Sequence, residues 1–136
     1  MTLVMDISSG VSKSRKQQIE REAKTALLGD IVNFPISEMG EQFGNPDLGD
    51  EYRSPIKTEV PTLFVSGVLD NNTQPFQADE VRKTFKNSTH IVIDNAGHES
   101  MLVDPKVQQT MVEFLRGEDV SKVRIALPAL KFQPLP

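Results

Sequence analysis

Two side chains in this sequence have the types and the spacing for acid–base chemistry. Asp70 lies three residues after Gly67, where one apolar run ends, and His98 lies four residues after Asp94, where a second run ends. If both runs are parallel strands of one sheet, their loops leave the same edge, which is where open α/β sheets bind ligands. A carboxylate there can fix the tautomer of an imidazole, so we predict that Asp70 orients His98 as a general base.

The two apolar runs and the segment between them predict a βαβ unit. Residues 61–67 and 89–94 are short and almost continuously apolar, which is typical of strands buried on both faces of a parallel sheet. A helix between them is predicted from a first-turn proline and an apolar repeat, which are Pro75, Ala78, Val81 and Phe85. The sequence therefore belongs to the α/β class.

A further helix is expected after the second strand. Asp104 followed by Pro105 is a strong helix start, and Gly117 is a natural stop. The apolar stripe between them consists of Val107, Met111, Phe114 and Leu115. The tail, residues 123–136, alternates apolar residues with prolines, so we expect it to lie extended across the body.

The first half of the chain has weaker signals. The spacing of Ile19, Ala23, Ala26 and Leu27 predicts an amphipathic helix from Ser12 to Leu28, with Ser12 as N-cap and Gly29 just past its end. Residues 30–59 are punctuated by proline and glycine, so we expect short helical turns in a covering layer. The predicted organisation is a mainly helical region, residues 1–55, a core segment, residues 56–119, and an extended tail, residues 120–136.

Composition excludes several classes of function. The 136 residues carry 15 Lys and Arg against 19 Asp and Glu, a net charge of -4, which argues against a nucleic-acid partner. No cysteine is present, so disulfides, thiolate nucleophiles and sulfur-ligated metals are excluded. We expect no metal and no cofactor, because the carboxylates are scattered and no phosphate-binding glycine motif follows a strand. We find neither a signal peptide nor an apolar stretch of ~20 residues, so we expect a soluble chain with no membrane partner. The compartment is left open, and the cytoplasm is slightly favoured.

The same residues resemble a known family. Residues 60–70, Val-Pro-Thr-Leu-Phe-Val-Ser-Gly-Val-Leu-Asp, and residues 93–98, Ile-Asp-Asn-Ala-Gly-His, resemble the C-terminal end of an α/β-hydrolase of the proline iminopeptidase and tripeptidyl-aminopeptidase-like branch. Residues 28–35, 46–50 and 54–57 resemble the stretch that leads from that family's cap into its acid-bearing strand. The resemblance implies a partial α/β-hydrolase fold, the C-terminal βαβα of the core sheet preceded by a helical cap remnant.

The resemblance also implies roles for the two side chains. By it, Asp70 is the acid and His98 the base of a catalytic triad. The family usually has Thr-Pro together after the acid, whereas this chain has Thr73, Gln74 and Pro75. We expect that difference to alter the helix start slightly and to leave the acid in place.

The nucleophile of that fold is missing from this sequence. It sits on a Gly-x-Ser-x-Gly elbow before the acid and the histidine, and no such motif occurs here. The glycine pattern of the elbow is absent around each of these serines: Ser8, Ser9, Ser12 and Ser100. The predicted function is the C-terminal portion of a serine hydrolase, aminopeptidase-like or esterase-like, which is inactive alone and acts on a peptide or ester only in the intact enzyme.

Partners and alternatives follow from that prediction. The partner would be the missing N-terminal half or a second copy of the chain, because a two-stranded sheet leaves open edges. The alternative is a non-catalytic interaction or assembly module on a hydrolase-derived scaffold. Asp94 and Glu99 rank below Asp70 as acids, and His90, inside the second strand, is predicted to be structural or exposed. The basic residues of the first helix, Lys13, Arg15, Lys16, Arg21 and Lys24, are expected to form a solvated face rather than an anion site.

Overall fold

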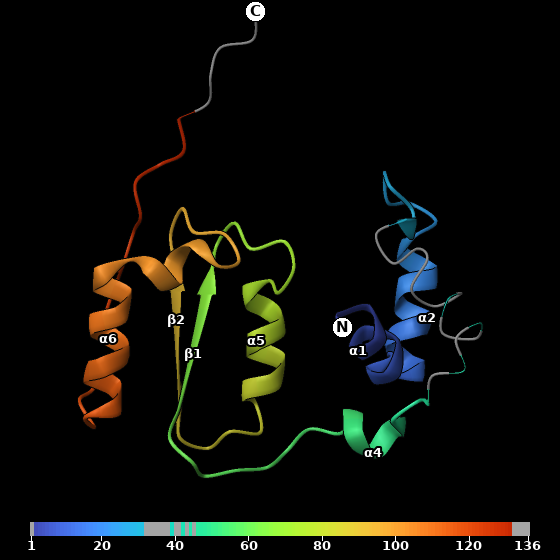
Figure 1. The fold of residues 1–136 in the computed structure, drawn as a ribbon, viewed down its shortest axis with the longest axis horizontal. Coiled ribbons are helices and arrows are strands. Elements are labelled where there is room, and N and C mark those ends of the chain that lie inside the picture. Colours follow the sequence, from blue (N-terminus) through green and yellow to red (C-terminus); the bar gives the residue numbers. More distant parts are fainter. Residues whose placement is uncertain (1, 32–38, 40–41, 43, 45, 132–136) are drawn as a thin grey trace, which may run out of the picture. The chain divides into compact units, whose positions relative to one another are not determined.

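The computed structural model describes residues 2–31, 39, 42, 44 and 46–131 of the chain. They form two compact units, Met1–Ser54 and Pro55–Pro136. Figure 1 shows helices in the described part of the first unit and a strand pair between helices in the second. Each unit is described here by itself.

The described residues of the first unit include helices α1 (Thr2–Ser9), α2 (Lys13–Glu22) and α4 (Gly49–Arg53). Hydrogen bonds connect the end of α1 to the segment around α4. The Leu48 N–H donates to the Ser8 carbonyl at 2.9 Å, and Arg53 donates to the Ser9 carbonyl at 2.9 Å. Arg53 also pairs with Asp47 and, with the Gly49 N–H, lowers the pKa of that carboxyl to about 2.

The predicted start of helix α2 is confirmed, and its predicted end is wrong. The Ser12 hydroxyl accepts from the Arg15 N–H at 3.3 Å, as an N-cap should. The helix ends at Glu22, however, and not at Leu28, and none of its residues is buried. Leu27, predicted to be part of an apolar stripe, is fully exposed. A helix of this length that buries no face is marginal, because packing supplies most helical stability.

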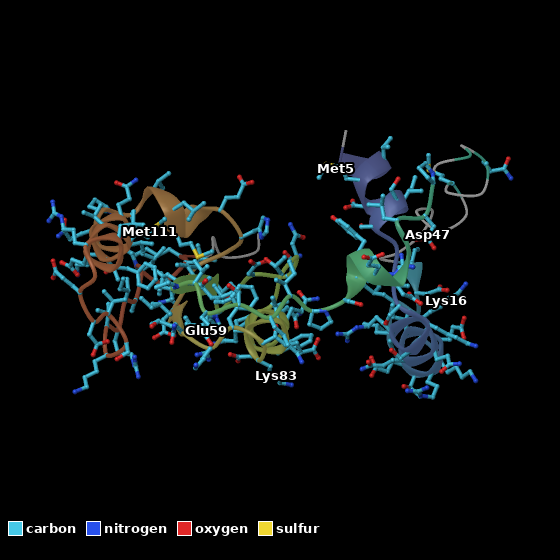
Figure 2. All side chains as sticks on the ribbon, turned by 90° about the horizontal axis from the view of Figure 1, so that it is seen from below. Met5, Lys16, Asp47, Glu59, Lys83 and Met111 are labelled. Atoms are coloured by element: carbon cyan, nitrogen blue, oxygen red, sulfur yellow. The ribbon has the colours of Figure 1, made fainter. Side chains whose placement is uncertain are left out.

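Other expectations for this unit have mixed outcomes. Helix α1 was not predicted. Helix α4 is one short turn of the kind expected between residues 30 and 59, but residues 32–38, 40, 41, 43 and 45 lie outside the described residues. Of the basic residues predicted for this helix, Lys13, Lys16 (labelled in Figure 2), Arg21 and Lys24 are exposed and Arg15 is half-buried, which fits the expected solvated face.

The second unit contains the predicted βαβ unit. Strands β1 (Thr62–Gly67) and β2 (Ser88–Ile93) pair in parallel, in a register that puts Phe64 opposite His90. Helix α5 (Pro75–Arg82) connects them and starts with Pro75 in its first turn, as predicted. Its capping box is made by Gln74 and Gln77.

The last member of the predicted apolar repeat of α5 lies three residues beyond the end of the helix. Phe85 was assigned to the helix, which instead ends at Arg82. Phe85 forms an isolated parallel bridge with Thr58, and its ring packs edge-on against Phe64 at 5.3 Å between centroids. The aromatic contact with the strand outweighs a further helical turn.

The sheet lies between two helices. Helix α6 (Pro105–Leu115) and α5 cover opposite faces of the strand pair (Figure 1). Alternate strand residues face α6 and form the core with its Val107, and the buried members are Ile91, Ile93, Ala96, Met101, Val107, Val120 and Ile125. Asp104 caps α6 by accepting from the Lys106 N–H at 2.9 Å, which confirms the predicted start. Leu115, predicted to be part of the apolar stripe, is instead 81% exposed.

The segment after α6 returns along the second strand. The Asp94 N–H donates to the Ile125 carbonyl at 3.0 Å, and the Leu127 N–H donates to the Asp94 carbonyl at 2.9 Å. Val120 and Ile125 are buried in the core. The predicted extended tail is therefore packed against the end of β2 as far as Leu127, and residues 132–136 lie outside the described residues.

Candidate functional site

The loop after β1 holds a carboxylate in its own backbone. One oxygen of Asp70, Oδ1, accepts from the N–H groups of Asn72 and Thr73, both at 2.9 Å. Aspartate favours such local bonds two and three residues ahead, which is why this residue type suits the turn. The side chain of Asp70 is only 2% exposed. The turn therefore fixes a buried carboxylate at the carboxyl end of the strand.

The loop after β2 is pressed against the end of β1. The Leu69 N–H donates to the Ala96 carbonyl at 2.8 Å, and Ala96 itself is fully buried. Gly67 makes this approach possible, because a Cβ there would collide with the Ala96 carbonyl and lie 2.8 Å from the Gly97 carbonyl oxygen. Asn95 turns the chain with a φ of 58°. These contacts carry His98 to the loop that holds Asp70.

Asp70 and His98 are in direct contact. Nδ1 of His98 lies 3.0 Å from Oδ2 of Asp70. The Thr73 hydroxyl donates to the same Oδ2 at 2.8 Å, and its oxygen lies 3.2 Å from the His98 Nδ1. The His98 side chain is 42% exposed, while its acid partner is buried. An orienting acid is thus shielded from water beneath an imidazole that water and other molecules can reach.

The carboxylate stays ionised in its buried setting. Burial by itself raises the pKa of Asp70, but four hydrogen bonds act in the opposite direction. In decreasing order they come from the Thr73 N–H, His98, the Thr73 hydroxyl and the Asn72 N–H, and together they hold the pKa well below its usual range. Asp70 is therefore an acceptor only.

The hydrogen bonds assign the proton on the imidazole. An ionised Asp70 supplies no proton, and the single hydroxyl proton of Thr73 is directed to Oδ2. Nδ1 of His98 must then be the donor that approaches Oδ2 and the Thr73 oxygen. Among the described residues Nε2 has no hydrogen-bond partner. In the neutral ring Nε2 is thus an unshared acceptor, the atom a general base uses.

A comparison with protein families places the chain in a family. The model of the TAP-like protein family matches residues 46–122, more than half of the chain, including both loops. The chain belongs to the TAP-like family of α/β-hydrolases. No curated protein and no solved structure gives a significant match. The α/β class and hydrolase ancestry predicted from the sequence are therefore established, while the catalytic roles of the two residues stay predictions.

The lower-ranked acids do not reach the histidine of this TAP-like chain. Asp94 is exposed, and its backbone groups are engaged with Ile125 and Leu127. Glu99 is exposed beside His98. In the described part of the chain, neither carboxylate bonds the imidazole.

A second histidine of the TAP-like chain has a complete set of partners that the sequence did not predict. Nδ1 of His90 lies 3.0 Å from Oδ1 of Asp79, and Nε2 lies 3.0 Å from the Ser66 hydroxyl. The order of atoms is that of a Ser–His–Asp triad. His90 was expected to be structural or exposed, and its side chain is only 5% exposed. The strand register brings the two strand residues to one face, and that register is not readable from spacing alone.

The geometry around His90 is that of a structural crosslink. Ser66 is 4% exposed inside β1, on the face that α5 covers, and not on a sharp strand-to-helix turn. A hydroxyl that is buried in this position and bonded to His90 is not presented to a substrate carbonyl. The pKa of Asp79 is lowered by its hydrogen bonds to His90 and then to Arg82. This set ties α5 to the sheet through three polar side chains.

Two further findings concern ligands and membranes. The described residues contain no group of three or more His, Asp or Glu side chains placed to hold a metal ion. No helix in the described part of the chain combines the length and apolarity needed to cross a membrane.

Proposed function

We propose that this chain supplies the acid and the base of a serine hydrolase that cleaves a peptide or ester bond. In this proposal His98 is the general base, Asp70 orients it, and the nucleophilic serine comes from a polypeptide segment outside these 136 residues. The chain is then the C-terminal βαβα part of an α/β-hydrolase, with the helices of residues 1–55 as part of its cap. It does not hydrolyse substrate alone.

One observation carries the proposal. A buried Asp70 and an accessible His98 are joined at 3.0 Å through Nδ1, which leaves Nε2 as the free acceptor. A triad needs this arrangement, because the acid must fix the tautomer and the other nitrogen must meet the serine. Family membership adds that the same two loops lie in a hydrolase domain.

The chemistry follows from the two nitrogens. Nε2 of His98 takes the proton of the supplied serine as its oxygen attacks the carbonyl carbon, and then gives that proton to the leaving amine or alcohol. Water then attacks the acyl-enzyme ester with the same help, which releases the acid product and frees the serine. Asp70 remains ionised throughout and stabilises the imidazolium.

The partner in this proposal adds to the sheet at β1. Among the described residues β1 pairs only with β2, so its other edge has unpaired backbone groups. Val68 and Leu69, in the loop after β1, are about half exposed. Open edges and exposed apolar residues favour association, with the nucleophile-bearing half or with a second copy. The same features support the alternative, a non-catalytic assembly module.

Reconstitution tests the function against the alternative. The chain is co-expressed with an N-terminal hydrolase half that carries a Gly-x-Ser-x-Gly elbow, and the purified complex is assayed on aminoacyl anilides and simple esters. We expect hydrolysis by the complex, none by the chain alone, and loss of activity in His98→Ala. A stable, stoichiometric complex that does not hydrolyse either substrate would favour the assembly module.

A further inference from the structure

We infer that Thr73 is a positioning residue that locks the Asp70 carboxylate in the rotamer that receives His98. The inference rests on the proposed function, and it concerns a side chain that touches both members of the pair. Thr73 contributes its backbone N–H to one carboxylate oxygen and its hydroxyl to the other.

The Thr73 hydroxyl bonds the carboxylate oxygen that the backbone N–H groups of the turn do not reach. Both backbone bonds, from Asn72 and Thr73, end at Oδ1. The two oxygens of a planar carboxylate turn together about the soft Cβ–Cγ bond, and the backbone bonds resist that rotation only through Oδ1. The Thr73 hydroxyl, at 2.8 Å from Oδ2, adds a restraint on that rotation at the other oxygen, the one that faces the ring.

The hydroxyl also holds the imidazole itself. Its oxygen lies 3.2 Å from Nδ1 of His98, so the N–H is shared between Oδ2 and the Thr73 oxygen. His98 is 42% exposed, and water competes for its ring nitrogens. Two acceptors on one side of the ring keep the proton on Nδ1 and restrict the rotation of the side chain. A charge-assisted bond with a second acceptor is harder for water to replace than one bond alone.

Two substitutions at Thr73 separate the effect of its hydroxyl from the effects of its backbone N–H and its side-chain volume. Thr73→Val keeps the backbone N–H, the β-branch and the volume, and removes only the hydroxyl. Thr73→Ser restores the hydroxyl. Residue 73 is exposed, so neither change opens a cavity, and a single cooperative urea transition in each variant serves as the control for folding.

The test is ¹⁵N and ¹H NMR of the histidine rings in the full chain at alkaline pH, where the neutral tautomers are distinguished. We expect the wild type and Thr73→Ser to show protonated Nδ1 with a downfield, slowly exchanging proton on His98. In Thr73→Val that proton resonance broadens beyond detection, and the Nε2–H tautomer becomes populated. In the reconstituted enzyme, kcat falls between about 10- and 100-fold with KM unchanged, the range for a lost bond to a charged group.

The outcomes separate the inference from the function on which it rests. If Thr73→Val keeps the wild-type tautomer and the slow proton exchange, the positioning role is wrong while the proposed triad roles stand. If wild-type His98 carries its proton on Nε2, the proposed function fails, and with it any role for Thr73. His90, in the same spectra, is the internal reference, because its partners are unchanged in both variants.

Discussion

The two histidines of the second unit differ in which member of the His–Asp pair is buried. His90 is 5% exposed and its acid, Asp79, is 54% exposed, whereas His98 is 42% exposed and its acid, Asp70, is 2% exposed. Both have a carboxylate oxygen 3.0 Å from Nδ1. The difference lies at Nε2, which is bonded to Ser66 in His90 and has no partner among the described residues in His98.

The comparison shows that a Ser–His–Asp order of atoms does not define an active site. In His90 every polar atom of the ring is satisfied inside the protein, so the ring has no capacity left for a substrate or a nucleophile. In His98 the buried acid fixes one side of the ring, and the other side meets solvent. A general base needs an accessible ring nitrogen that has no partner within the protein. Of the two histidines, only His98 has such a nitrogen among the described residues.

The largest expected effect comes from removing the base. In the reconstituted complex, His98→Ala should lower kcat/KM by about 10⁴- to 10⁶-fold, and Asp70→Asn by about 10⁴-fold, because the wrong tautomer cannot accept the serine proton. Steady-state hydrolysis of an ester substrate measures both. Ser66→Ala is the matched control and should retain activity. Loss of hydrolysis in Ser66→Ala, with the complex intact, would reverse the assignment of the two histidines.

A smaller backbone change should affect the loop of His98. Gly67→Ala places a methyl group against the Ala96 carbonyl, so the loop must shift or the strand must bend. We expect a loss of about 1–3 kcal/mol in the free energy of unfolding, the usual range for overpacking. Urea unfolding measures it, and the His98 Nδ1–H resonance should move as well. A wild-type urea midpoint and an unmoved resonance would contradict the close packing of the two loops.

The structural role of His90 predicts a loss of stability. His90→Leu removes both of its hydrogen bonds and leaves the buried Ser66 hydroxyl without that partner, at a cost of about 1–3 kcal/mol. His98→Leu removes one bond to Asp70 but leaves Oδ2 bonded to the Thr73 hydroxyl, and the replaced ring is at an exposed position, so it should cost less than His90→Leu. Urea midpoints of the two variants compare them directly. Equal losses would remove the distinction between a structural and an accessible histidine.

The smallest effect is a pH dependence from Asp70. Its pKa is lower in the folded chain than in the unfolded one, where it is about 3.9, so it stabilises the fold above that value. This contribution is lost as the pH falls below about 4 toward the folded pKa. The difference in unfolding free energy between wild type and Asp70→Asn should therefore shrink between pH 7 and pH 3. Asp79 has a lowered pKa in both proteins, so it cancels.

The contact between Asp70 and His98 was predictable because it depends on strong local signals. Two apolar runs and a proline-started helix predict parallel neighbours, and the loops after such strands meet at one edge. The roles of Gly67 and Thr73 were not predicted. Predicting the role of Gly67 requires the distance between two backbone segments, and predicting the role of Thr73 requires the direction of its hydroxyl. Neither follows from residue spacing.

The remaining differences have a common physical origin. The end of α2 at Glu22 and the exposed Leu27 depend on packing that helical periodicity does not report. The Ser66, His90 and Asp79 set depends on strand register and on the rotation of α5 above the sheet. The two apolar runs do place Ser66 and His90 on strands, but only the register puts them on one face within bonding distance.

The central claim is that His98, and not His90, is the base of a hydrolase whose serine lies outside this chain. Fluorophosphonate labelling followed by intact mass and peptide mapping tests it, because the probe reacts only with an activated serine. We predict no adduct on the chain alone, an adduct on the supplied elbow serine in the complex, and loss of that adduct in His98→Ala. An adduct on Ser66, or labelling of the elbow serine that persists without His98, would contradict the account.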